Sequence, residues 1–127
     1  MNNKKIITKE APLPIGPYTQ ATEAHGFVFI SGQIAIDPKT GKILNNDITE
    51  ETTQVMKNIN GILKAAGLGF NHIVKASIFL KNLGDFEKVN AEYATYFNEN
   101  NTPARECIEV SRLPKDVNVE ISVIAAR

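Results

Sequence analysis

The stretch TPARECIEV, Thr102–Val110, decides how the last third of this chain folds. Pro103 has no backbone N–H to donate, so it favours the first position of a strand over the middle of one. Successive side chains of a strand point to opposite faces, which places Arg105 and Cys107 on one face and Glu106 on the other. We therefore expect a strand that presents an arginine and the single cysteine of the chain on the same side.

A second strand is predicted at residues 118–126, NVEISVIAA, after a turn short enough for the two strands to pair antiparallel. The register of this pairing determines where Arg105 lies relative to Glu120. If Glu109 pairs with Glu120, the two side chains share a face. If Val110 pairs with Glu120, they do not. Both registers stay open at this point, because a slip of one residue turns a whole strand over.

Upstream of these strands, apolar and β-branched runs indicate further strands. They are expected at the start of the segment 4–21, in residues 26–37 and in residues 72–82. Prolines at positions 12, 14 and 17 exclude a helix between the first two strands and favour an extended path. Residues 37–43, DPKTGKI, carry the proline and glycine of a hairpin turn.

Two helices separate the strands. Asp47 and Glu50 have the spacing of a capping pair that opens the first helix, and Gly67 or Gly69 ends it. Asp85 is expected to cap the second. This order predicts a two-layer α+β domain over residues 1–127, in which one mixed, mostly antiparallel sheet carries both helices on one face.

The other face of the sheet is then left without a cover. We expect Phe29, Val119 and Ile121 on this uncovered face. Because a large apolar surface is unfavourable in water, the pattern predicts that further copies of the chain cover it in a closed homo-oligomer.

The bulk composition excludes several classes of protein. The chain has 127 residues, 43% of them hydrophobic, and its 14 basic and 14 acidic side chains give no net charge. Nucleic-acid binding is therefore not expected, because it depends on clustered Lys and Arg. One cysteine cannot form an internal disulfide, the amino-terminal residues do not resemble a signal peptide, and no apolar run is long enough to span a membrane. We expect a soluble cytoplasmic protein.

Arg105 and Glu120 allow two interpretations if they share a face. They can form a structural ion pair, which is the commoner arrangement in proteins. Alternatively, Arg105 can grip a small carboxylate through two parallel hydrogen bonds while Glu120 holds a water and moves protons. Neither His25 nor His72 has the spacing of a metal site, and we expect Cys107 to be a small buried side chain without a base to activate it.

Three further residues have both a structural and a functional interpretation. Tyr18 can anchor the amino-terminal segment or close a pocket. Gly32, in the middle of a predicted strand, indicates a bulge or a close approach of the backbone to another group. Asn90 can form local hydrogen bonds on its helix or reach the same pocket.

Four stretches of the sequence resemble one known family. They are PIGPYTQA (14–21), VFISGQIAIDPKTG (28–41), KNINGILKAAGLGFNHIVKASIFLKNLGDFEKVNAEYATYF (57–97) and PARECIEVSRLPKDVNVEISVIA (103–125). Together they closely resemble the RidA/YjgF family of reactive intermediate deaminases, over Ile6 to Ala126.

The resemblance implies a chorismate-mutase-like fold and a homotrimer with its sites between subunits. It also implies hydrolysis of 2-aminoacrylate and related 2-imino acids, such as 2-iminobutanoate and 2-iminopropanoate, to 2-keto acids and ammonia. Pyridoxal-phosphate enzymes release these substrates, and the deaminase itself needs no cofactor or metal.

The same resemblance implies roles for individual residues. Arg105 corresponds to the arginine that binds the substrate carboxylate, and Glu120 to the glutamate that positions the attacking water. The remaining positions that correspond to the pocket are Tyr18, Ser31, Gly32, Asn90 and Cys107.

Two features depart from the family pattern. The segment NENNTPARE (98–106) is shorter than in many relatives and has no aromatic residue just before Pro103, which affects the rim of the pocket. Glu106 stands where a small or neutral residue is common, but strand alternation points it away from Arg105. The alternative to an enzyme is a trimeric small-ligand-binding regulator of translation or of purine genes, a role to which members of the family have been linked.

Overall fold

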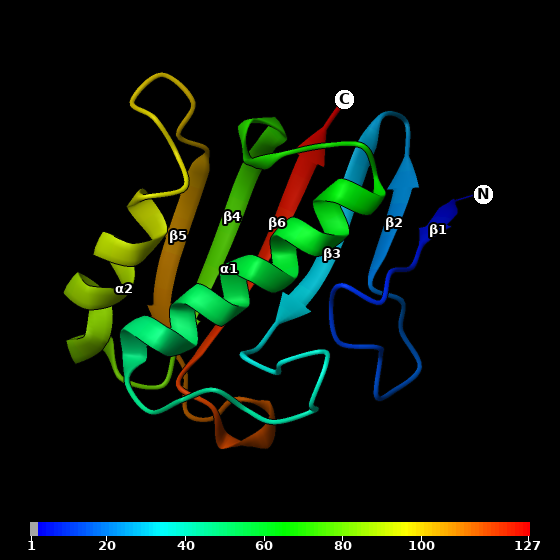
Figure 1. Cartoon of the computed structure of the whole chain (residues 1–127). Coiled ribbons are helices and arrows are strands. Elements are labelled where there is room, and N and C mark those ends of the chain that lie inside the picture. The colour runs from blue at the N-terminus through cyan, green and yellow to red at the C-terminus, as the bar shows by residue number, and fades with distance from the viewer. Residues whose placement is uncertain (1–2) are drawn as a thin grey trace.

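The computed structural model describes residues 3–127, which form a six-stranded sheet and two α-helices (Figure 1). The strands are β1 (Lys4–Ile6), β2 (Ala21–Ala24), β3 (Phe27–Gln33), β4 (Ile73–Leu80), β5 (Ala104–Glu109) and β6 (Val119–Ala126). The helices are α1 (Ile48–Ala65) and α2 (Phe86–Ala94). The strands lie side by side in the order β1-β2-β3-β6-β4-β5. Only β4 and β5 run parallel, so the sheet is mixed and mostly antiparallel, as predicted.

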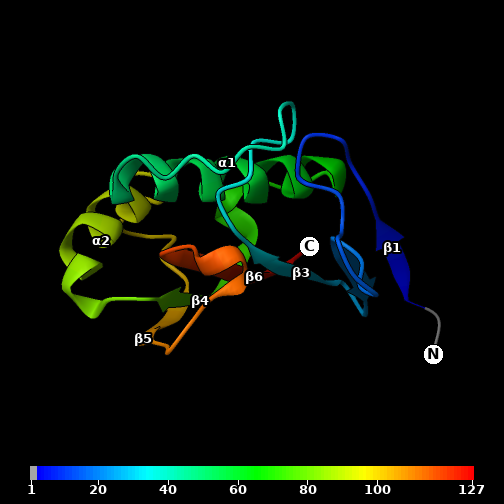
Figure 2. The same ribbon diagram turned by 90° about the horizontal axis from the view of Figure 1, so that it is seen from below.

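Both helices lie on the same side of the sheet (Figure 2). Val55, Ile59 and Ile62 of α1 are fully buried, as are Ile78 of β4 and Ile121 of β6. Burying each of these side chains stabilises the fold by roughly 1.5–3 kcal/mol before the cost of ordering the chain. This confirms the two-layer α+β architecture with two helices on one face.

The ends of α1 follow the signals in the sequence. The Asp47 side chain accepts a hydrogen bond of 2.7 Å from the backbone N–H of Glu50. At the other end, Gly67 has a φ of +75°, a conformation that glycine adopts without steric cost. Asp85 precedes α2 as expected, but its side chain makes no capping hydrogen bond there. Within residues 3–127, neither helix combines the length and apolar character needed to cross a bilayer.

The predicted pairing of the last two strands is wrong. β4 lies between them, pairing in parallel with β5 and antiparallel with β6. The connection between β5 and β6 is not a tight hairpin, since Lys115 and Asp116 have positive φ and the chain turns across the end of β4. On one side of that end the Val110 N–H bonds to the Leu80 carbonyl, and on the other side the Lys81 N–H bonds to the Asn118 carbonyl.

The composition of the uncovered face also differs from the expectation. Phe29 does lie there and is 44% exposed, together with Phe27 and Ile108. Val119 and Ile121 do not, because both are 0% exposed and pack on the helix side. The intervening side chains of β6, including that of Glu120, therefore point to the uncovered face.

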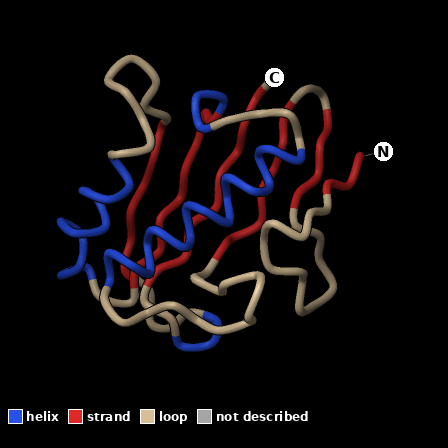
Figure 3. The backbone as a smooth tube through the Cα atoms, viewed as in Figure 1, coloured by secondary structure: helices blue, strands red, loops and turns tan. Residues whose placement is uncertain are grey.

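Two local features of the sheet depart from simple sequence patterns. β2 follows the long irregular segment after β1 (Figure 3) and pairs with β3, although ATEA has little strand character. A register shift between Ile73 and Lys75 moves Val74 out of the core face, so Ile73 is buried in its place and Val74 is exposed.

Candidate functional site

Arg105 extends from β5 towards α2. Its Nη1 donates a hydrogen bond of 2.7 Å to Asn90 Oδ1. The guanidinium carbon lies 5.1 Å from the centre of the Tyr93 ring and 5.7 Å from that of Phe86, distances at which the aromatic faces attract the charge. Since Asn90 accepts one of the five N–H donors of the guanidinium, the planar fork is oriented and can still bind a carboxylate.

Arg105 lines a hollow of about 520 Å³ between α2 and the segment before β5. Other lining residues are Asn90, Tyr93, Ala94, Phe97, Asn98, Glu99, Thr102 and Pro103. Cys107 lines a neighbouring hollow of about 510 Å³ with Leu83, Gly84, Phe86 and Glu87. Burial raises the pKa of the Cys107 thiol, and the charge of Arg105 offsets this only in part. The neutral thiol is therefore favoured, which fits a lining residue better than a nucleophile.

Glu120 lies in a separate and much smaller hollow, of about 70 Å³. Its other lining residues are Pro12, Leu13, Ile15, Tyr18, Gln20, Gly32, Gln33, Ile34, Ile36 and Pro114. Burial raises the pKa of the Glu120 carboxyl above its ordinary value of 4.5. A carboxylate with a raised pKa in a mostly apolar hollow is suited to accept a proton and to return it.

Gly32 lies at a β-bulge and also in close contact with another group, the two arrangements suggested by its place in a predicted strand. The register of β3 against β6 shifts between Ile30 and Gln33, which is the expected bulge. A Cβ atom at Gly32 would also lie 2.7 Å from Glu120 Oε2, closer than the two atoms can approach. The missing side chain of Gly32 therefore provides the space that the Glu120 carboxylate occupies.

Ser31 forms hydrogen bonds with the segment that carries Tyr18. Its hydroxyl donates a 2.6 Å hydrogen bond to the Thr19 carbonyl, and its backbone N–H donates a 2.9 Å hydrogen bond to the Gln20 carbonyl. Ser31 thus holds the chain beside Tyr18 rather than presenting a free hydroxyl.

The site residues predicted from the sequence fall into two groups on opposite sides of the sheet. Arg105, Asn90 and Cys107 lie on the helix side of the sheet, at its β5 edge. Glu120 lies on the uncovered side, together with Tyr18 and Gly32. Within one chain, Arg105 and Glu120 therefore share neither a face nor an ion pair. The Glu106 carboxylate instead pairs with Lys75 at 2.9 Å and accepts a hydrogen bond from Ser77, away from Arg105 as expected.

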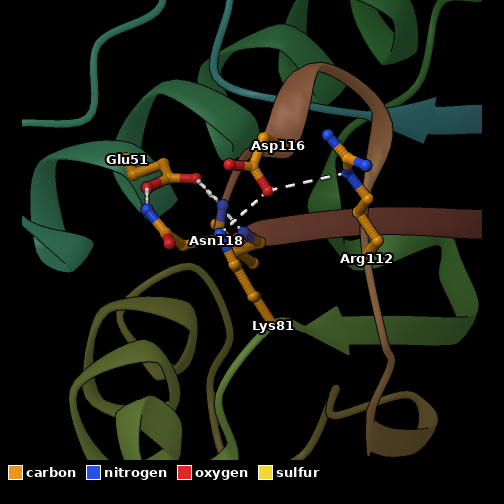
Figure 4. A network of polar contacts seen from close by, with 6 residues as sticks. Glu51, Lys81, Arg112, Asp116 and Asn118 are labelled. Atoms are coloured by element: carbon orange, nitrogen blue, oxygen red, sulfur yellow. Dashed lines mark hydrogen bonds and ion pairs between the residues drawn. The ribbon is translucent and has the colours of Figure 1, made fainter.

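The start of β6 is held by a buried carboxylate, that of Glu51, which was not among the residues predicted from the sequence. Glu51 of α1 is fully buried and accepts hydrogen bonds from the Asn118 backbone N–H at 2.7 Å, from Asn118 Nδ2 at 2.8 Å and from the Val119 N–H at 3.1 Å (Figure 4). This network fixes the chain immediately before Glu120. Helical spacing was the available signal, because Glu51 falls on the buried stripe four residues before Val55.

A second set of ion pairs lies beside this network at the protein surface. Asp116 contacts Lys81 Nζ at 2.8 Å and Arg112 Nε at 3.9 Å (Figure 4). Hydrogen bonding to Lys81 lowers the pKa of Asp116. Exposed pairs of this kind contribute little to stability, so Glu51 is the main polar anchor of this end of β6.

Comparisons with a family model and with known sequences identify the same family. The profile of the family described as Endoribonuclease L-PSP matches residues 8–127. A RutC family protein of Pyrococcus horikoshii is 55% identical over 120 residues, which cover 94% of each chain. A protein of Salmonella typhimurium named 2-iminobutanoate/2-iminopropanoate deaminase is 47% identical over 127 residues, which cover 98% of each chain.

Comparison with solved structures leads to the same class of fold. The structure of Escherichia coli TdcF with bound serine superposes with a TM-score of 0.92 at 40% identity and covers 98% of each chain. The fold is that of an α+β protein of the kind to which these relatives belong. This chain belongs to the Endoribonuclease L-PSP family, which is the YjgF/RidA family that its motifs resemble.

Proposed function

We propose that this protein is an enamine and imine deaminase that converts 2-iminobutanoate, 2-iminopropanoate and 2-aminoacrylate to 2-keto acids and ammonia. The observation that carries the proposal is the pair of half-sites, an oriented guanidinium at Arg105 and a partly buried carboxylate of raised pKa at Glu120. The name of the Salmonella relative, at 47% identity over nearly the full length, supports the same chemistry.

The proposed reaction uses the two half-sites on one substrate. Arg105 binds the carboxylate of the imino acid, which places the adjacent imine carbon beside a water held by Glu120. Glu120 accepts a proton as the water oxygen forms a bond to that carbon. Glu120 returns this proton to the nitrogen. The carbon–oxygen double bond then forms as the carbon–nitrogen bond breaks, and the hydroxyl proton leaves with the ammonia as ammonium, which releases the keto acid. Water is the only co-reactant, so the reaction has no step that requires a cofactor or metal.

The proposed site lies between subunits of a homotrimer. Arg105 and Glu120 leave opposite sides of the sheet, so a shared substrate needs Arg105 from one copy and Glu120 from another. The uncovered face supports such an assembly, since Phe27, Phe29 and Ile108 are each 44–46% exposed there.

The other residues have supporting roles in this proposal. Tyr18 and Gly32 shape the wall beside Glu120, and Cys107 lines the hollow beside Arg105 without taking part in bond formation. Asn90 orients Arg105 through its hydrogen bond and lines the same hollow, where it contacts the substrate. We place the enzyme in the cytoplasm, where pyridoxal-phosphate dehydratases release such imines.

A coupled assay tests the proposal directly. A serine or threonine dehydratase generates the imine, and semicarbazide traps what remains, for the wild type, Arg105→Ala and Arg112→Ala. Arg112 is a matched control because its side chain is 79% exposed and lies on another segment. We expect the wild type and Arg112→Ala to accelerate hydrolysis and Arg105→Ala to lose this activity while remaining trimeric.

Two results would count against the proposal. If the wild type accelerates no imine derived from serine, threonine or leucine, the regulatory ligand-binding alternative becomes the better account. If Arg105→Ala dissociates the oligomer, Arg105 has a structural role instead.

A further inference from the structure

The buried side chain of Gln20 ties the segment after β1 to the start of β2. Gln20 is 1% exposed. Its Nε2 lies 3.0 Å from the carbonyl oxygen of Thr8, 3.1 Å from that of Ala11 and 2.8 Å from that of Pro12. Its Oε1 accepts a 2.7 Å hydrogen bond from the Thr8 N–H. One side chain thus pairs with four backbone groups of Thr8, Ala11 and Pro12.

These contacts require an amide. The nitrogen of Gln20 carries two hydrogens, which three carbonyl oxygens share, and the oxygen faces a donor. A carboxylate of the same shape would place an oxygen without hydrogens against those carbonyls. An apolar side chain would leave buried backbone groups without partners, which is costly.

The segment held by Gln20 continues directly into the wall of the Glu120 hollow. Leu13, Ile15 and Tyr18 line that hollow, yet they are 58%, 67% and 50% exposed. Little packing within the chain therefore fixes their positions. Gln20 holds the segment before Leu13, and Ser31 holds it after Tyr18 through the Thr19 carbonyl.

We infer that Gln20 is a positioning residue, which sets the placement of Tyr18 beside Glu120 and so controls the reactivity of the site. The inference rests on the proposed deaminase function for its kinetic consequence. Its structural consequence, an ordered segment 8–19, is independent of that function.

A double-mutant cycle tests the kinetic consequence. We expect Gln20→Glu to lower kcat/KM about tenfold or more, with kcat falling more than KM rises, because a misplaced wall weakens orientation of the reacting groups. In a Tyr18→Ala background, the same substitution is expected to cost less than about twofold, since its effect passes through Tyr18. Full multiplication of the two losses, or wild-type kcat/KM in Gln20→Glu, would overturn the inference.

Thr52→Ala is the control for loss of a buried polar contact. Thr52 is fully buried, and its hydroxyl donates a 2.8 Å hydrogen bond to the Ile48 carbonyl within α1, but it does not line the Glu120 hollow. We expect this variant to lose stability and to keep the wild-type kcat/KM. Gln20→Met, which retains the apolar volume, replaces Gln20→Glu if the carboxylate prevents folding.

Hydrogen exchange separates a failure of this inference from a failure of the proposed function. In Gln20→Glu or Gln20→Met, amides of residues 8–19 should exchange faster than in the wild type, while those of α1 remain protected. This result is expected even if the wild type hydrolyses no imine. Unchanged exchange in residues 8–19 would overturn the inference whether or not the enzyme is active.

Discussion

Arg105 is the strand partner of Ala76, and Glu120 is the partner of Phe79 in the same central strand, β4. Ala76 is fully buried under the helices, whereas Phe79 points to the other side of the sheet. The two charged side chains therefore leave opposite faces of one sheet. A substrate that touches both must lie between two copies of the chain.

Mixing of inactive variants should restore activity if the site is shared. Arg105→Ala and Glu120→Ala are each expected to be inactive alone. If the variants refold together at equal amounts into the proposed trimer, random assembly restores one site in four, and about a quarter of the wild-type activity is expected. The measurement is imine hydrolysis before and after mixing. No recovery, in a preparation shown by mass spectrometry to contain mixed trimers, would contradict a site between subunits.

Gly32→Ala should separate activity from stability. The new Cβ would lie 2.7 Å from Glu120 Oε2, and the end of this flexible side chain can move aside. We expect a melting temperature close to that of the wild type but a loss of roughly tenfold or more in kcat/KM, because the carboxylate is displaced from its hollow. Thermal unfolding and the coupled assay measure the two effects. A fully active Gly32→Ala would show that the position of the carboxylate is not important.

Glu51→Ala should destabilise the protein strongly. The substitution leaves the backbone N–H groups of Asn118 and Val119 and the side-chain amide of Asn118 without their buried acceptor, at a cost of about 3 kcal/mol or more. Glu87 is the matched control, as an exposed acidic residue in the first turn of α2, and Glu87→Ala should cost about 0.5 kcal/mol. Urea unfolding at one protein concentration compares the two. Equal losses would mean that the network around Asn118 adds nothing to stability.

The raised pKa of Glu120 predicts a specific dependence of stability on pH. Burial favours the protonated carboxyl, so the folded protein binds this proton more tightly than the unfolded chain does. The contribution of Glu120 to stability is therefore full below the unfolded-state pKa of 4.5 and is lost as the pH rises through the higher folded-state pKa. Glu120→Gln, which cannot ionise, should gain stability relative to the wild type as the pH rises from about 4 to about 7. A difference between the two proteins that does not change with pH would exclude this ionisation.

Local patterns in the sequence predicted the helices and most strands. They did not predict contacts between segments that are far apart in the sequence. The Asp47 cap and the buried stripe of α1 depend on neighbours a few residues apart, so they could be read directly. The insertion of β4 between β5 and β6 could not, because a crossing through residues 110–118 and a tight hairpin have similar lengths. The separation of Arg105 from Glu120 follows from that insertion. The role of Gln20 could not be predicted from local patterns either, because its hydrogen-bond partners lie 8 to 12 residues away in the sequence.

The position of β6 also has a consequence for synthesis of the protein. This strand is the last of the six in sequence, yet it lies between β3 and β4 and contacts both along most of its length. On the ribosome, β3 and β4 emerge first and have no partner in common until β6 follows. The unfinished sheet therefore exposes two open strand edges, which are prone to pair with other chains. We expect this protein to complete its folding only after residue 126 has left the exit tunnel, so that its yield in the cell depends on protection of the nascent chain.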